Sequence, residues 1–370
     1  MKFKNMAAVG AFSLATVMAL SACSSGGSNN SSTSGSNTSA IDYSTLSGTI
    51  TAGGSTAQAN AEAAWITAFT AQATGVTINY DKSQGSGGGV TNWLAGSYDF
   101  AGSDAYLKPD QQVSAQAICG GGAVNLPVYL DGVSIIYNLP GVSKLNLSPE
   151  NVAKIFALTI TTWNDPSLVA DNPGVALPST PITTVTRSDG SGTTQTFSTY
   201  LSEVAPTIWT SPASNTWPIA GSSAQKGGSG VVQAVTAGAG TIGYADHSAI
   251  GSLSSAAIGS GKDFVVFSQN AVTAAFALAA TRADTGVKGD LAQKIDYTKL
   301  TSADVYPIPL VSYQIVCTTF KDPAQAKLTT AYLGFVASEI GQAIAAKNAG
   351  AAKVPADLLA QIHDTLETIK

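Results

Sequence analysis

Two patterns of apolar residues alternate along most of the chain. Apolar runs of about four to eight residues predict β-strands, and apolar residues at every third or fourth position predict amphipathic helices. Strands are predicted at 49–52, 76–80, 99–102, 183–186 and 241–244. Helices are predicted from 61 through 69, through 93 and 94, at 149–158, from 187–194 through 201, and at 231–236. The alternation indicates a layered α/β fold.

Two longer apolar stretches, 124–137 and 308–317, suit strands that cross between two domains. Two crossings imply a discontinuous first lobe, lobe I (41–127 and 286–370), with lobe II (128–285) inserted into it. This is the hinged architecture of solute-binding proteins, where the ligand lies in the cleft between the lobes. The C-terminal part is predicted to be helical, with one apolar face formed by Leu328, Tyr332, Phe335, Val336, Ile340 and Ile344.

The first residues have the parts of a secretory signal peptide, predicted at 1–22. Lys2 and Lys4 precede an apolar run from Ala7 to Leu20, which is short for a membrane span and is followed by small residues. An uncleaved membrane anchor is the alternative. Residues 20–23, Leu-Ser-Ala-Cys, resemble the lipobox of bacterial lipoproteins, and this resemblance implies that Cys23 is diacylated and becomes the mature N-terminus.

The predicted tether, 23–40, is nearly all Ser, Gly, Asn and Thr after Cys23. Such a segment buries too little apolar surface to offset the entropy of ordering it, so we expect a flexible coil. A coil of this length reaches roughly 20–25 Å. The folded part is therefore expected outside the cell, anchored by lipid to the outer face of a bacterial cytoplasmic membrane.

The composition narrows the possible partners. Charged residues make up 11% of the chain, with a formal net charge of −5, and an acidic chain without a Lys/Arg cluster argues against nucleic acid. His247 and His363 lack ligand-like neighbours, so no metal site and no cofactor are predicted. With Cys23 assigned to lipid, Cys119 and Cys317 are an even pair in an oxidising compartment, which predicts a disulfide. Two buried, inert thiols are the alternative.

Three predicted strands end in turns rich in Gly, Ser and Thr that open helices: 53–56, 85–89 and 189–194. A helix N-terminus presents unpaired N–H groups and the positive end of the helix dipole, and glycine lets an anion approach the backbone. Helix capping alone also explains any one turn. Three such turns, one beside an arginine, favour a shared oxyanion site.

The charged residues at these turns support the same interpretation. Arg187 offers a planar, permanently charged group suited to an oxyanion; a purely structural ion pair is its alternative role. Asp189 is expected to orient Arg187 without touching the ligand, with Gly190 beside it. Asp104 follows a short strand and is either a ligand-binding carboxylate or the cap of the next helix.

These segments resemble, in order and spacing, the phosphate-binding receptors of Pst-type ABC importers. The resemblance covers the chain after the tether, and its most specific part is 187–193, Arg-Ser-Asp-Gly-Ser-Gly-Thr. It implies a type II solute-binding fold with hinge strands, no catalytic activity, and partners that are inorganic phosphate and the permease subunits. We also expect a monomer. The implied phosphate contacts are Ser55, the Thr56 backbone, Ser86 and Asp104 from one lobe, and Arg187, Ser191, Gly192 and Thr193 from the other.

Other interpretations remain open at this point. The same scaffold could receive sulfate or molybdate, and a secreted phosphatase could use Ser191 or Ser86 as its nucleophile, although no base or triad pattern accompanies either serine. The segment 227–230 also precedes a predicted helix and is interpreted as a plain cap or turn, because nothing charged accompanies it. The segment 259–262 lacks the full pattern of a phosphate-binding loop. Thr56 replaces the aromatic residue of many members of this family, and the second turn is one residue longer, which makes Ser86 a less secure prediction than Arg187.

Overall fold

A single mixed β-sheet runs through the part of the chain that the computed structural model describes, residues 42–370. Those residues belong to one compact unit; the predicted signal peptide, Cys23 and the tether lie outside them. The strand order is β2-β1-β3-β14-β4-β8-β6-β7, with β9 also paired to β4. The strands are β1 (Ser47–Gly54), β2 (Gly75–Asp81), β3 (Phe100–Ser103), β4 (Ala123–Asn138), β6 (Thr183–Arg187), β7 (Ser223–Gln225), β8 (Thr241–Asp246), β9 (Ser254–Ser255) and β14 (Pro309–Cys317).

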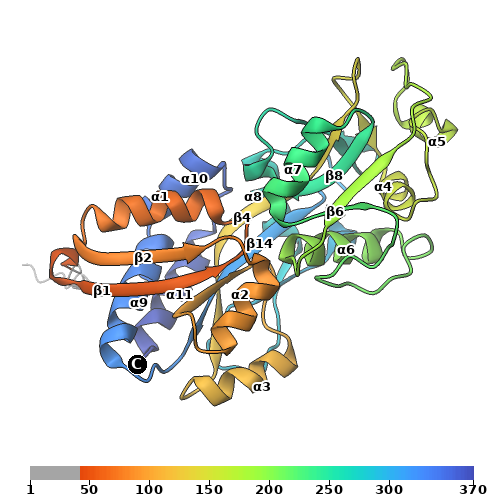
Figure 1. Ribbon diagram of the computed structural model, residues 1–370. Coiled ribbons are helices and arrows are strands. Elements are labelled where there is room, and N and C mark those ends of the chain that lie inside the picture. Colours follow the sequence, from red (N-terminus) through yellow and green to blue (C-terminus); the bar gives the residue numbers. More distant parts are fainter. Residues whose placement is uncertain (1–41) are drawn as a thin grey trace, which may run out of the picture. The chain divides into compact units, whose positions relative to one another are not determined.

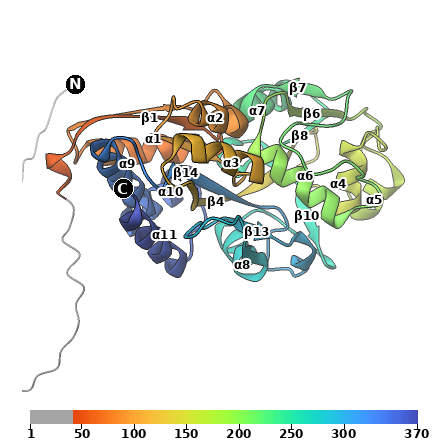
Figure 2. The ribbon, with the colours of Figure 1, turned by 90° about the horizontal axis from the view of Figure 1, so that it is seen from below.

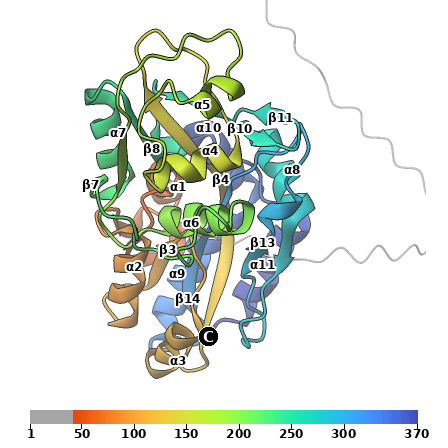
Figure 3. The ribbon, with the colours of Figure 1, turned by 90° about the vertical axis from the view of Figure 1, so that its right-hand side faces the viewer.

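Strand β4 joins the two halves of this sheet. From Ala123 to Gly132 it pairs antiparallel with β14, and from Val133 to Asn138 it pairs antiparallel with β8. Every residue of β4 except the last is buried, which explains its long apolar sequence. The prediction of a crossing strand at 124–137 is therefore confirmed, and Figure 3 shows β4 and β14 running side by side.

Helices cover the lobe I half of the sheet (Figures 1 and 2). Ala61, Trp65 and Phe69 recur every four residues along α1, and all three are fully buried. The Phe69 ring meets Tyr332 of α9 at a centroid distance of 5.3 Å. This spacing explains why the segment forms a helix with one face in the core. The helices are α1 (Ala59–Thr70), α2 (Gly85–Leu94), α3 (Pro109–Ile118), α9 (Pro323–Ala337), α10 (Glu339–Ala349) and α11 (Ala356–Thr368).

The lobe II half carries its own helices and small sheets. A buried aromatic cluster, which includes Phe156 of α4, Phe197 of α6 and Tyr244 of β8, holds α4 and α6 to strand β8. The helices are α4 (Pro149–Phe156), α5 (Pro166–Asp171), α6 (Gly192–Val204), α7 (Gly227–Ala237) and α8 (Gln269–Ala279). The other small strands of residues 42–370 are β5 (Asn146–Leu147), β10 (Ala257–Ser260), β11 (Asp263–Val265), β12 (Ala280–Arg282) and β13 (Gln293–Ile295), of which β13 lies after residue 285. The 3₁₀ turns are η1 (Tyr43–Thr45), which precedes β1 in lobe I, η2 (His247–Ala249) and η3 (Tyr297–Lys299).

Two sequence-based expectations need correction. The stretch 308–317 does not itself cross between lobes, because β14 pairs with β3 and with the first half of β4; the chain returns to lobe I before Pro309. The single apolar face expected through Ile340 and Ile344 is interrupted. Ser338 is extended and its side chain accepts a hydrogen bond from the Gly341 N–H at 3.1 Å. A new helix starts there, which leaves Ile340 64% exposed.

A disulfide bonds Cys119, at the end of α3, to Cys317, at the end of β14. Their Cα atoms lie 5.1 Å apart across a sequence separation of 198. The predicted pairing is therefore confirmed, and the alternative of two free thiols is wrong. Among the helices of residues 42–370, none combines the length and apolar character needed to cross a bilayer.

Candidate anion-binding site

The three glycine-rich turns meet where the lobe I and lobe II halves join, with α2 and α6 adjacent (Figure 1). The β1–α1 turn and the first turn of α2 come from lobe I, and the β6–α6 loop comes from lobe II. Gly54, at the end of β1, has φ +133°, and a Cβ there would lie 2.2 Å from the Gly102 carbonyl oxygen. Glycine is therefore required for β1 and β3 to end so close together.

Asp104 is the centre of the hydrogen-bond network at this junction. Its carboxylate accepts from the Ser55 hydroxyl in a short contact, from Ser312 at 2.6 Å, and from Ser86 and Thr193, each at 3.3 Å. The Asp104 N–H also donates to the Ser86 Oγ at 3.1 Å. Asp104 is 5% exposed. It does not cap the next helix, whose first turn is preceded by Lys108, so the capping alternative is wrong.

Burial is the largest influence on Asp104, and it raises the pKa of this carboxyl group. The hydroxyls of Ser312 and Ser55, the charge of Arg187 and the Thr193 hydroxyl all act in the opposite direction. Hydroxyls that donate to a carboxylate stabilise its ionised form, whereas loss of water disfavours it. Asp104 is thus a desolvated carboxyl surrounded by groups that can rotate their hydrogens.

Arg187 ends β6 and lies 3% exposed. Its Nε donates to the Asp189 Oδ1 at 2.7 Å, and its Nη2 makes a short contact with the other carboxylate oxygen. The expected ion pair is present, with Asp189 holding the guanidinium in a fixed orientation. Nη1 reaches the Thr56 hydroxyl across the junction at 3.4 Å.

Arg187 and Asp189 each stabilise the charged form of the other. Burial acts to lower the pKa of Arg187, but the hydrogen bond and charge of Asp189 outweigh it and the pKa is raised. Burial acts to raise the pKa of Asp189, but Arg187 and the Gly227 N–H outweigh it and the pKa is lowered. Both groups are therefore charged, and Asp189 neutralises part of the field that an anion would meet at Arg187.

The remaining predicted residues lie at the N-terminus of α6 or directly against it. Ser191 caps the helix by accepting from the Thr194 N–H at 3.1 Å. A Cβ at Gly192 would lie 2.6 Å from both the Asp104 Cβ and the Ser86 Oγ. The Gly190 carbonyl accepts from the Gly87 N–H at 2.9 Å. Only a glycine at 192 lets the two helix N-termini approach so closely.

Sequence reasoning missed two contributors. Ser312 comes from β14, and the signal for it was a small polar residue, next to Tyr313 and Gln314, within a mostly apolar run. The segment 227–230, interpreted as a plain cap or turn before a helix, does form the N-terminus of α7, but it also faces the cluster. The Gly227 N–H donates to the Asp189 Oδ1 at 3.0 Å, and the Gly228 N–H donates to the Thr56 Oγ1 at 3.4 Å. The view that nothing charged accompanies this segment is therefore wrong.

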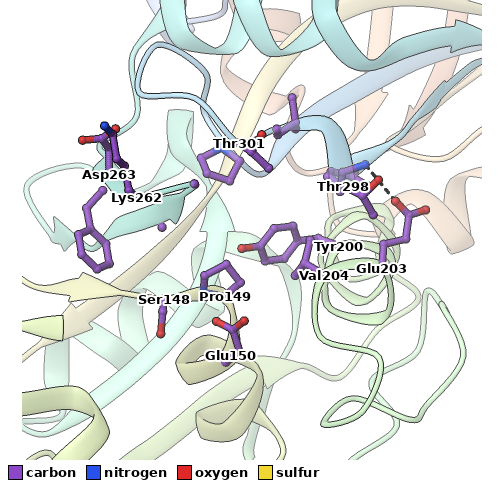
Figure 4. A pocket seen from close by; sticks show the side chains of 16 residues that line it. Ser148, Pro149, Glu150, Tyr200, Glu203, Val204, Lys262, Asp263, Thr298 and Thr301 are labelled. Carbon is purple, nitrogen blue, oxygen red and sulfur yellow. Dashed lines mark hydrogen bonds between the residues drawn. The ribbon is translucent and has the colours of Figure 1, made fainter. Parts of the chain in front are cut away.

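Figure 4 shows a cavity of about 400 Å³ lined by α4, α6, the β10–β11 turn and η3. It contains no residue from the predicted site. Its charged lining consists of Glu150, Glu203, Asp263 and Lys262, an excess of carboxylates that suits an anion poorly. The segment 259–262 forms part of this wall as a β-hairpin turn, consistent with its exclusion as a phosphate-binding loop. Within residues 42–370, no group of three or more His, Cys, Asp or Glu side chains could hold a metal ion.

A buried cluster of one arginine, a carboxylate and several hydroxyls, at the junction of two α/β lobes that share the crossing strand β4, defines a two-lobed solute-binding protein with an oxyanion-type site. The PBP superfamily domain matches residues 36–339. Phosphate-binding protein PstS 3 of Mycobacterium leprae is 36% identical over 79% of each chain, and PstS2 of Mycobacterium bovis is 36% identical over 92% of each. The chain belongs to the PBP superfamily and, within it, to the PstS family of phosphate-binding proteins.

Solved structures agree on the fold. A periplasmic phosphate-binding protein, PfluDING, bound with phosphate, aligns at TM-score 0.68 and 20% identity over 86% of this chain and 93% of its own. A phosphate-binding protein of Stenotrophomonas maltophilia aligns at TM-score 0.66 and 18% identity over 86% of this chain and 94% of its own. The relatives are named for binding and not for a catalysed reaction. The His247 Nδ1 lies 2.9 Å from the Ser134 hydroxyl, and neither residue belongs to the predicted site.

Proposed function

We propose that this chain is an extracytoplasmic receptor that binds inorganic phosphate between its two lobes and delivers it to the permease of an ABC importer. The observation that carries the proposal is the meeting of Asp104 from lobe I with Thr193 and the Arg187 loop from lobe II in one buried cluster. Membership of the PstS family supports phosphate as the ligand.

The proposed contacts divide between the lobes. Lobe I contributes Ser55, Thr56, Ser86 and Asp104, and lobe II contributes Arg187, Ser191, Gly192 and Thr193. Hydroxyls and the N–H groups at the starts of α2 and α6 donate to phosphate oxygens, and Arg187 supplies positive charge. The Thr56 hydroxyl already faces Arg187, so Thr56 is proposed to contribute its side chain as well as its backbone.

Asp104 gives the site its preference for phosphate. Inorganic phosphate near neutral pH carries at least one proton, which a buried carboxylate can accept as a hydrogen bond. Sulfate carries none, so it would place two acceptors and two negative charges against each other. Asp189 and Gly190 hold the Arg187 loop in position without contacting the ligand.

A ligand that contacts both lobes holds them together in the closed form. A ligand stabilises the closed form only by its greater affinity for that form, and contacts that one lobe alone cannot supply provide this difference. The permease then distinguishes the closed receptor from the open one. The receptor is proposed to work as a monomer, because the site lies within one chain.

The lobe boundaries remain a proposal. Sequence reasoning gave 41–127 and 286–370 for lobe I and 128–285 for lobe II. The change of partner along β4 between Gly132 and Val133 favours a slightly later first boundary. The bonds from the Ser260 hydroxyl to the carbonyls of Leu300 and Ser302, at 3.1 and 2.7 Å, favour a later second boundary.

We also propose that residues 1–22 are removed on export and that lipid on Cys23 anchors the protein, with 23–40 as a tether. The lipobox-like residues 20–23 and the polar composition that follows support this. A receptor held in this way stays close to its permease.

Calorimetry tests the proposed function. The exported Cys23→Ser chain is titrated with phosphate, sulfate and molybdate at neutral pH. We expect a tight single-site isotherm for phosphate and binding of the other two weaker by orders of magnitude. Equal or tighter binding of sulfate or molybdate would assign the chain to another oxyanion, and no heat with any of them would reject the receptor function.

A further inference from the structure

Two carboxyl groups that the phosphate contacts do not use are buried beside the junction of the lobes. Asp131 lies in β4 just before the strand changes partner, and Asp246 ends β8 opposite Val133 of β4. Both are 0% exposed. Neither forms an ion pair within residues 42–370.

Their hydrogen bonds show that they share one serine. The Asp131 carboxylate accepts from the Gly132 N–H at 2.8 Å, the Ser248 N–H at 3.1 Å and the Tyr129 hydroxyl at 3.2 Å. The Asp246 Oδ2 accepts from the Ser248 hydroxyl at 2.7 Å. The Asp246 Oδ1 is buried and has no hydrogen-bond partner among the described residues. Two ionised carboxylates in this setting would lose hydration and repel each other, so together they favour keeping a proton.

The surrounding charged groups do not offset the desolvation and mutual repulsion of the two carboxylates. Asp104 adds negative charge, and Arg187 is the cation whose charge reaches Asp246, but Arg187 is already paired with Asp189. Tyr129 and Tyr306, which face Asp131, have pKa values raised chiefly by burial. Burial lowers the pKa of the neighbouring His247 to about 4, so it is neutral near pH 7. Burial is also the largest influence on the pair: it raises the pKa of Asp246 to about 6 and that of Asp131 well above its usual value.

Groups from lobe I cover the pair. The Ser248 hydroxyl lies 3.3 Å from the Ala57 carbonyl oxygen, and the Asn60 side chain donates to the Ser248 carbonyl at 2.9 Å. A Cβ at Gly228 would lie 3.0 Å from the Asp246 Oδ1 and 3.4 Å from the Thr56 Oγ1. The β1–α1 turn thus closes over Asp246, and separation of the lobes would let water reach it.

We propose that the Asp131–Asp246 carboxyl pair is a proton-binding site and that closure of the lobes on phosphate takes up a proton there. The inference rests on the proposed function, because it assumes that phosphate closes the lobes. The proton comes from the acid form of the buffer: its bond to hydrogen breaks, the buffer keeps the electron pair, and an O–H bond forms on one aspartate. The uptake compensates for an anion entering a cluster that already holds four carboxyl groups and one arginine.

The test is calorimetry of the exported Cys23→Ser chain with phosphate at pH 6, in two buffers that differ in ionisation enthalpy. The difference in heat gives the number of protons taken up per phosphate. We expect this number to be about half to one proton larger than in the same chain carrying Asp131→Asn and Asp246→Asn, since a carboxyl with a pKa near 6 is half protonated at that pH. Ionisation of phosphate itself and of Asp104 contributes to both chains, so the difference between them reports the carboxyl pair together with the charge coupling of Asp246 to Asp104.

Glu62→Gln is the matched control. Glu62 is 1% exposed and burial raises its pKa to about 7, but its partners Gln314 and Tyr332 lie with it inside lobe I. Its surroundings do not change when the lobes move, so this substitution should leave the number of protons unchanged.

The outcomes distinguish failure of the proposed phosphate-binding function from failure of the proposed proton-binding site. If the starting chain gives no heat with phosphate, the proposed function fails. If phosphate binds but the double substitution leaves the proton number unchanged, the proton site is overturned. Should the double variant not fold, ¹³C NMR of the Asp carboxyl carbons in the unsubstituted chain gives the answer. A further protonated carboxyl signal should appear on addition of phosphate at pH 6, and its absence would overturn the inference.

Discussion

Replacement of Asp104 by Asn separates the charge of this residue from its shape. In the structure its Oδ1 accepts from Ser55 and Ser312, and these bonds remain possible in the amide. Its Oδ2 faces the hydroxyls of Ser86 and Thr193, which can turn to accept from an amide N–H. The variant should therefore fold normally, and its effect should appear in ligand choice.

The magnitude follows from the burial and the donors. A buried group that requires a hydrogen-bonding partner discriminates by roughly 10⁴–10⁵ against a ligand that lacks it, or about 5–7 kcal/mol. In Asp104→Asn, phosphate loses a hydrogen bond to a charged acceptor worth about 1.5–3 kcal/mol, or about 10–150-fold in affinity. Sulfate gains, because the amide can donate to it. We expect the ratio of phosphate to sulfate affinity to fall by at least about 10–150-fold.

The assay is a competition titration of both chains with phosphate and sulfate at neutral pH, with Arg187→Ala as the comparison. The arginine substitution should weaken both anions by similar factors, because its charge does not depend on a ligand proton. Two results would refute the reasoning: unsubstituted protein that binds sulfate within tenfold of phosphate, or an Asp104→Asn ratio equal to that of the unsubstituted protein.

Three further predictions concern the anchor, the disulfide and a buried acid. Cys23→Ser should release the intact chain from membranes without changing phosphate affinity; retention in the membrane fraction would reject the lipid anchor. Mass spectrometry of the unreduced, exported chain should find the Cys119 and Cys317 peptides linked, and removal of the bond should lower the free energy of unfolding by at most about 4–5 kcal/mol in the chain-entropy model; free thiols on both would contradict this. Burial raises the pKa of Glu62 from 4.5 to about 7, so its contribution to stability is present below about pH 4.5 and is lost as the pH rises through 7, by up to about 3 kcal/mol. Urea unfolding at pH 5 and pH 8 should show a smaller decrease in Glu62→Gln, and an equal decrease would disprove the assignment.

Much of the fold could be predicted from local patterns. The predicted strands and helices around the site correspond to β1, β2, β3, β6, β8, α1, α2, α4, α6 and α7. They were recognisable because each buries one face with a clear period or ends in a turn whose glycines admit few alternatives. The long buried run of β4 also predicted a crossing, because few other elements need so many consecutive apolar residues.

Local sequence patterns could not predict which residues far apart in the sequence come into contact. Ser312 reaches Asp104 across a sequence separation of 208, through the antiparallel register of β14 beside β3. The start of α7 reaches Asp189 for a similar reason, since β7, which precedes α7, pairs in parallel with β6 and places Gln225 opposite Arg187. The break at Ser338 was missed because the apolar period continues across it, while its cap depends on a single hydroxyl. The buried Asp131 also gave no signal, because a turn-like Asp-Gly in an apolar run suggests an exposed bend.

A crystal structure of the chain with phosphate tests the central claim most directly. The account predicts one phosphate between the lobes, within hydrogen-bonding distance of the Asp104 carboxylate and the Arg187 guanidinium at once, with hydroxyls from both lobes completing its contacts. Phosphate bound to one lobe alone, or in the cavity beside Lys262 and away from Asp104, would contradict it.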